Sequence, residues 1–131
     1  MKFLLMMNAA FGTGDWDIFQ WKPDEIKNHV AYWNSLNAEL RAAGELVSVQ
    51  ALTGPREARL VRAGKDGLPL TDGVFPETKE FLAGFWIVDV ESAARAHAIA
   101  ARASAAPGPG GKPLIMPIEV RQVMESPSQD L

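Results

Sequence analysis

The sequence of 131 residues contains no cysteine and only two histidines. A disulfide framework is therefore excluded, and the absence of thiols is typical of proteins from a reducing compartment. Zinc sites are usually built from Cys and His ligands, so two isolated histidines predict no metal site. No spacing of acidic residues indicates a site for a harder cation, and we expect no cofactor.

Long apolar runs and an excess of basic charge are also missing. The apolar run Phe3–Met7 is much shorter than the about 20 residues of a membrane span. It is also too short for a secretory signal, so we expect a soluble cytoplasmic protein with no membrane partner. The net charge is −3, with acids and bases mixed along the chain, which argues against a nucleic-acid partner.

Familiar catalytic motifs are absent as well. The glycines of residues 108–111 precede a predicted strand rather than a helix, so they do not form a phosphate-binding loop. No serine stands in a nucleophile elbow, and no cysteine is available as a nucleophile.

The residues that are present suffice for a packed core. Apolar residues make up 47% of the chain and include four tryptophans. A chain of this length buries roughly two thirds of its unfolded surface. We therefore expect residues 1–125 to form a single domain and the polar residues 126–131 to form a frayed tail.

Hydrophobic periodicity predicts four strands and two helices. The predicted strands are Lys2–Asn8, Leu46–Leu52, Phe81–Val90 and Met116–Met124, and the predicted helices are Pro23–Ala43 and Ala93–Ala105. The apolar stripe of the first helix consists of Ile26, Val30, Trp33, Leu36, Leu40 and Ala43. Gly44 is expected to end this helix in a left-handed cap, and Ser92 to cap the second.

A hairpin is predicted between the second and third strands. Ala58–Arg62 and Leu68–Thr71 flank the turn Gly64–Gly67, and Pro69 favours an edge position. Residues 9–22 are predicted to be a loop whose four aromatic residues lie on the body or on a partner subunit. A lid over a ligand is the alternative interpretation of this loop.

The order of these elements predicts an α+β chain with a ferredoxin-like βαββαβ fold and an inserted β-hairpin. In such a fold both helices cover one face of an antiparallel sheet. The other face is apolar too and needs a cover. A second copy of the chain is the natural cover, so we expect a homodimer in which the two sheets face each other.

The densest group of polar residues lies between the hairpin and the third strand, at Asp72–Glu80. Such loops often carry function. Asp72 is the first candidate for a catalytic base, and Phe75, Glu77 and Lys79 are candidates for ligand contacts. The alternative is structural, with Asp72 satisfying backbone groups of a turn and the other charges forming exposed ion pairs.

Three further residues are candidates for a site. His29 is either a proton shuttle or a hydrogen-bonded residue beside the apolar stripe of the first helix. Trp86 either lines a ligand pocket between the sheet and a partner or packs in the core. Arg121 either pairs with a carboxylate of the central segment or of a ligand, or lies on the surface.

The segment Asp72–Glu80 (DGVFPETKE) resembles the DGPF–ETKE signature of the DGPF branch of the YCII-related proteins, from which Val74 and Pro76 depart. Similar matches to the family patterns KYLLL, ELRAAG, LGGYYLIDV and VEVRP occur at Lys2–Met6, Glu39–Gly44, Leu82–Val90 and Ile118–Gln122. The resemblance implies a dimeric α+β barrel. Some YCII-type relatives carry a His on the first helix and an Asp further along the chain, proposed as a catalytic pair. The position that matches this His lies nearer Trp33 than His29 here, so the pair is not transferred.

Two functions follow from these observations. The first is a small-molecule-binding or regulatory module that acts without turnover, because no recognisable catalytic set is present. The alternative is a small-molecule enzyme of the acid/base lyase, isomerase or dehalogenase type, in which Asp72 works with Lys79 or Arg121. A purely structural dimer ranks below both. An enzyme requires Asp72 or His29 inside a closed pocket with a shifted pKa.

Overall fold

The structure, a computed structural model, describes residues 1–10, 18–74 and 80–125. Its strands are β1 (Lys2–Ala10), β2 (Leu46–Ala51), β3 (Arg59–Ala63), β4 (Pro69–Val74), β5 (Glu80–Asp89) and β6 (Ile118–Gln122). The helices are α1 (Pro23–Ala42) and α2 (Ala93–Ser104), with short 3₁₀ turns η2 (Ile18–Gln20), η3 (Pro55–Glu57) and η4 (Pro109–Gly111). The predicted strands and helices are thus confirmed, and the predicted polar tail, residues 126–131, lies outside the described residues.

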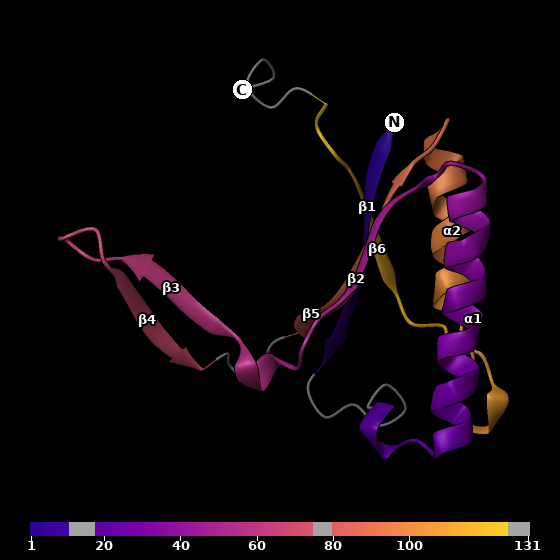
Figure 1. The fold of residues 1–131 in the computed structure, drawn as a ribbon, viewed down its shortest axis with the longest axis horizontal. Coiled ribbons are helices and arrows are strands. Elements are labelled where there is room, and N and C mark those ends of the chain that lie inside the picture. The colour runs from indigo at the N-terminus through magenta and orange to yellow at the C-terminus, as the bar shows by residue number, and fades with distance from the viewer. Residues whose placement is uncertain (11–17, 75–79, 126–131) are drawn as a thin grey trace.

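Four of the strands form one antiparallel sheet in the order β2-β5-β1-β6. Both helices lie on one side of this sheet (Figure 1). This α+β arrangement is consistent with a ferredoxin-like fold. The predicted loop over residues 9–22 begins too early, because β1 continues to Ala10 by pairing with the first residues of β5.

The core lies between the sheet and the two helices. It is built from alternate residues of the central strands, which turn every second side chain to the helices. Its members include Phe3, Leu5, Trp86, Val88, Leu36, Leu40 and Ile99. Gly84 belongs to the same sheet and allows the close approach of β2, because a Cβ there would lie 2.9 Å from the carbonyl oxygen of Gln50.

The opposite face of the sheet has an apolar centre. Leu4 pairs with Ile87 and Met6 with Phe85, across β1 and β5, and all four side chains are only partly buried. We call these four residues the apolar stripe of the sheet. Within the described part of the chain, no helix covers this face (Figure 1).

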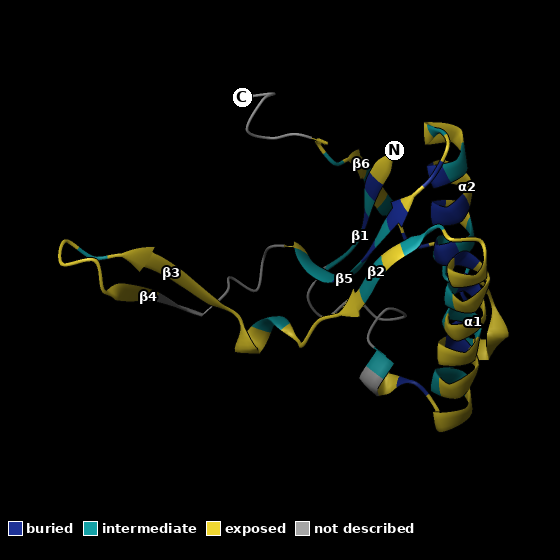
Figure 2. Ribbon diagram, turned by 45° about the horizontal axis from the view of Figure 1, so that its top comes forward, coloured by how far each residue is buried: buried dark blue, intermediate teal, exposed yellow. Residues whose placement is uncertain are grey.

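Strands β3 and β4 pair with each other in a separate two-stranded sheet. We call residues 59–74 the ribbon. It extends away from the sheet on the side opposite the helices, and the part coloured by burial is almost entirely exposed (Figure 2). A two-stranded sheet of this kind has no core of its own.

Side-chain and backbone caps fix the ends of both helices. At the start of α1 the backbone N–H of Lys22 donates to Glu25 Oε1 (2.9 Å), and at the start of α2 the N–H of Arg95 donates to Ser92 Oγ (3.2 Å). At the end of α1, Gly44 has φ +72°, and the N–H of Glu45 donates to the Leu40 carbonyl (2.9 Å). This Schellman cap confirms the role predicted for Gly44.

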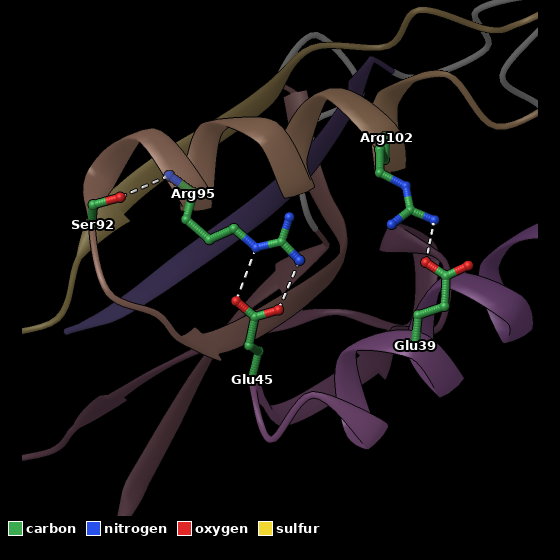
Figure 3. Close-up of polar contacts among 5 residues, drawn as sticks. All are labelled: Glu39, Glu45, Ser92, Arg95 and Arg102. Atoms are coloured by element: carbon green, nitrogen blue, oxygen red, sulfur yellow. Dashed lines mark hydrogen bonds and ion pairs between the residues drawn. The ribbon is translucent and has the colours of Figure 1, made fainter.

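Two ion pairs join α2 to α1 and to the segment that follows α1 (Figure 3). Arg95 makes a bidentate contact with Glu45, with Nε to Oε2 at 2.9 Å and Nη2 to Oε1 at 2.7 Å. Arg102 Nη2 contacts Glu39 Oε2 at 2.6 Å. The Arg95 hydrogen bond lowers the pKa of the Glu45 carboxyl. This bidentate pair joins α2 to the residues that directly follow α1.

We predict that Gly44→Ala lowers the free energy of unfolding by about 1–2 kcal/mol, because an L-residue is strained at a positive φ. Urea denaturation followed by circular dichroism measures this change. Gly54→Ala is the matched control, because Gly54 has φ −61° and a Cβ added there would meet no atom within 4 Å. A loss of stability at Gly54 equal to that at Gly44 would contradict the assignment.

Candidate functional site

The predicted polar site is described only at its two borders. Asp72 lies in β4, although its side chain is not described, and Glu80 opens β5 with an exposed side chain. The predicted ligand contacts Phe75, Glu77 and Lys79 lie outside the described residues. The described residues next to this segment in the chain are those of β4 and β5.

An apolar hollow lies at the base of the ribbon. Its volume is about 340 Å³, and its walls come from the residues between β2 and β3 and from the start of β5. The lining residues are Leu52, Thr53, Gly54, Pro55, Ala58, Phe81 and Leu82. Phe81 and Leu82 follow directly on Glu80, so the hollow and the central polar segment are neighbours in the chain.

His29, the second catalytic candidate, lies within the apolar stripe of α1 rather than beside it. Its side chain is 3% exposed, whereas Val30, a member of the predicted stripe, is 44% exposed. The buried positions 29, 36 and 40 of α1 follow helical spacing, which places Val30 about 100° away from them. The predicted stripe is therefore wrong at this turn.

The imidazole of His29 is enclosed by aromatic rings. The ring of Trp21 lies edge-on at a centroid distance of 5.0 Å, and that of Trp33 at 4.1 Å. His29 Nδ1 is 2.9 Å from the carbonyl oxygen of Pro107. Because a carbonyl only accepts hydrogen bonds, Nδ1 carries the proton in the neutral ring.

Burial lowers the pKa of His29 below its usual value, since a charged ring would lose its hydration among the tryptophans. The hydrogen bond to the Pro107 carbonyl acts in the opposite direction and is the smaller effect. His29 is therefore held neutral at physiological pH. It is not among the residues that line the hollow.

Neighbouring residues of α1 bind the end of α2 in the same way. Tyr32 Oη donates to the carbonyl of Arg102 (2.8 Å), and Trp33 Nε1 donates to the carbonyl of Ala103 (3.3 Å). The last carbonyls of a helix have no partner within the helix. The side chains at positions 29, 32 and 33 thus satisfy the last turn of α2 and the loop after it, which is a structural role.

Trp86 lies in the core, with 2% of its side chain exposed. Its Nε1 donates to Asn37 Oδ1 (2.9 Å), and its ring stands edge-on to Trp33 at 5.4 Å. Of the two roles considered for Trp86, the structure shows the packing one. Arg121 lies on the opposite face of the sheet, exposed on β6 and opposite Leu4.

The structure does not bring the two catalytic candidates together. β4, which contains Asp72, belongs to the ribbon, while α1 with His29 lies on the other side of the sheet (Figure 1). His97, on α2, is exposed. In the described ranges no group of three or more His, Asp or Glu residues is placed to hold a metal ion.

Sequence reasoning misses two parts of the His29 environment. The carbonyl of Pro107 comes from a loop whose composition reveals nothing about its contacts. Trp21 falls in a predicted loop of undefined position, yet it is 8% exposed and packs on the His29 ring. One contact of His29 does have a sequence signal: Trp33 and His29 are four residues apart, which places them side by side on one helix face.

Comparison with protein families identifies the chain. A profile of the YCII-related domain matches residues 1–110. The chain belongs to the YCII-related family. A search of curated proteins finds no match to this YCII-related chain. No helix in the described parts of this YCII-related protein is long and apolar enough to cross a membrane.

We predict that protonation of His29 destabilises the fold. The pKa of His29 is lowered from 6.5 in the folded state, so the unfolded state binds the proton more tightly. The free energy of unfolding should therefore decrease as the pH falls below about 6.5 and level off below the folded-state pKa of His29. Urea denaturation at a series of pH values measures this slope.

The variant His29→Asn should lose this part of the pH dependence, because its amide can donate to the Pro107 carbonyl but does not titrate. His97→Asn, at the exposed histidine, is the matched control and should keep the slope. A slope that persists unchanged in His29→Asn would show that another group is responsible.

Proposed function

We propose that this protein is a homodimeric module that binds a small apolar molecule in the hollow at the base of the ribbon. The hollow itself carries this proposal. Its volume of about 340 Å³ falls in the range of small-molecule sites, and its lining is mostly apolar. Two of its lining residues, Phe81 and Leu82, follow in the chain directly after the segment whose sequence first indicated a site.

The chemistry of the lining favours binding over turnover. Among the described residues of the hollow, Thr53 offers the only polar side chain. Acid/base catalysis needs an ionisable group within hydrogen-bond reach of the substrate. A neutral, largely apolar ligand held by shape, with one hydrogen bond to the Thr53 hydroxyl, fits this surface best.

The alternative function, an acid/base enzyme, has less support. It needs Asp72 to act with Lys79 or Arg121. Arg121 is on β6, three strand spacings from β2, which corresponds to roughly 14 Å across the sheet. The hollow adjoins the β2 edge of the sheet, so a single substrate of modest size does not reach both the hollow and Arg121.

The homodimer rests on the apolar stripe of the sheet. Leu4, Met6, Phe85 and Ile87 form a continuous apolar centre. Polar residues flank it on the edge strands, with Gln50 opposite Phe85 on β2 and Glu119 opposite Met6 on β6. An apolar patch with a polar rim is typical of a protein interface.

In this arrangement two sheets face each other across a two-fold axis, which is the dimeric α+β barrel.

We further assign the chain to the DGPF branch of the family, on the segment Asp72–Glu80. The ribbon is then an insertion into the ferredoxin-like plan, between its second and third strands.

We predict that Ala58→Phe weakens the binding of a neutral apolar fluorophore such as N-phenyl-1-naphthylamine. The added ring occupies the hollow, and steric differences of this size change affinity by roughly tenfold or more. A fluorescence titration gives both dissociation constants. Ala63→Phe is the matched control, because Ala63 is exposed on β3 outside the hollow. Equal affinity in the two variants would place the site elsewhere.

We predict that Ile87→Glu converts the dimer to a monomer at micromolar concentration. A charge buried at the centre of an interface costs about 2 kcal/mol or more, or roughly a thirtyfold weaker dimer. Sedimentation equilibrium measures the change, and circular dichroism checks the fold. Gln50→Glu adds the same charge at the exposed edge of the same face and should weaken the dimer far less. A folded Ile87→Glu dimer of normal affinity would contradict the interface.

A further inference from the structure

The ribbon has apolar side chains that are exposed in the described part of the chain. Leu60, Val61, Leu68 and Leu70 are 49–64% exposed. Among the described residues, β3 and β4 pair only with each other. An isolated two-stranded ribbon is marginally stable in water, so its apolar side chains indicate contact with another surface.

The position of the ribbon indicates where that surface lies. The ribbon extends from the sheet on the side opposite α1 and α2, in both views (Figures 1 and 2). This is the side of the apolar stripe. A second copy placed on the stripe therefore lies alongside the ribbon, and by two-fold symmetry each copy extends its ribbon along the other.

The charges of the ribbon suit the same partner. The ribbon, residues 59–74, contains three of the 13 Lys and Arg residues and two of the 16 Asp and Glu residues, giving this segment a net charge of +1. The rest of the chain then carries −4, since the total is −3. A positive arm on a negative body is complementary between two copies of the same chain.

One face of the ribbon is better suited to this contact than the other. Leu70 pairs with Arg62. Leu60 lies two residues before Arg62 on β3, at the register shift between Arg59 and Val61, and the alternation of β3 places it on the same face. The opposite face has Val61, Thr71, Ala63 and Pro69. The first face therefore presents the two larger apolar side chains.

Resting on the homodimer proposed above, we propose that the ribbon is an arm that clasps a second copy of this chain with its Leu60 and Leu70 face. The clasp extends the interface beyond the sheet and covers the exposed leucines. It also gives β3 and β4 the packing that they lack within one chain.

The absence of native cysteine allows a direct test. Leu70→Cys and Thr71→Cys place one thiol on each face of β4, at adjacent residues that are both exposed in the single chain. In the dimer, the thiol of Leu70→Cys should react with a charged maleimide at least roughly tenfold more slowly than that of Thr71→Cys. The difference should disappear when Ile87→Glu is added to both variants.

The oligomeric state of each variant is measured by sedimentation in the same buffer, which separates the clasp from the dimer. Equal reaction rates in an intact dimer would overturn the clasp and leave the homodimer standing. Faster reaction at Leu70→Cys, or protection that persists in the Ile87→Glu background, would also overturn it. A wild-type chain that sediments as a monomer would overturn both proposals.

Discussion

Burial of the sheet is the constraint on which the rest of this structure depends. The two central strands, β1 and β5, have apolar side chains on both faces of the sheet. In the described part of the chain, the two helices cover one of these faces and leave the other open (Figure 1). The covered face contributes Leu5 and Val88 to the core, both fully buried. The other face leaves Leu4 and Ile87 partly exposed, and it is this imbalance that leads to the proposed dimer.

On the covered side, the two helices are joined by polar contacts as well as by packing. Side chains at positions 29, 32 and 33 of α1 reach the last carbonyls of α2 and the loop after it. The ion pair between Arg102 and Glu39 connects the same two helices, and the pair between Arg95 and Glu45 connects α2 to the segment that follows α1. His29 belongs to this structural system, which accounts for a buried histidine without assigning it a chemical step. A neutral imidazole is required there, because its surroundings are two indole rings and a carbonyl.

Much of this fold is predictable because its signals are local. Strand periodicity identifies β1 and β5, Gly44 marks the end of α1, and Ser92 marks the start of α2. The position of His29 is not predictable in the same way, since Val30 is the more apolar residue and helical phase alone decides between them. The hollow is not predictable either, because it combines residues 52–58 with Phe81 and Leu82 across an intervening ribbon. Such sites depend on the tertiary meeting of segments, for which a single sequence has no short-range signal.

The pairing of β2 with β5 has a consequence for how this chain can change. The two strands are antiparallel neighbours, so a short turn is enough to connect them. The ribbon lies between them in sequence, and its strands β3 and β4 pair with each other rather than with the four-stranded sheet. Directly after β2, the N–H of Leu52 still donates to the carbonyl of Ala83 on β5 (2.9 Å). Insertions, deletions or a foreign segment in this interval should leave the sheet and its helices intact. The interval is therefore a place where evolution, or an engineer, can replace one recognition element with another while the body of the protein stays the same.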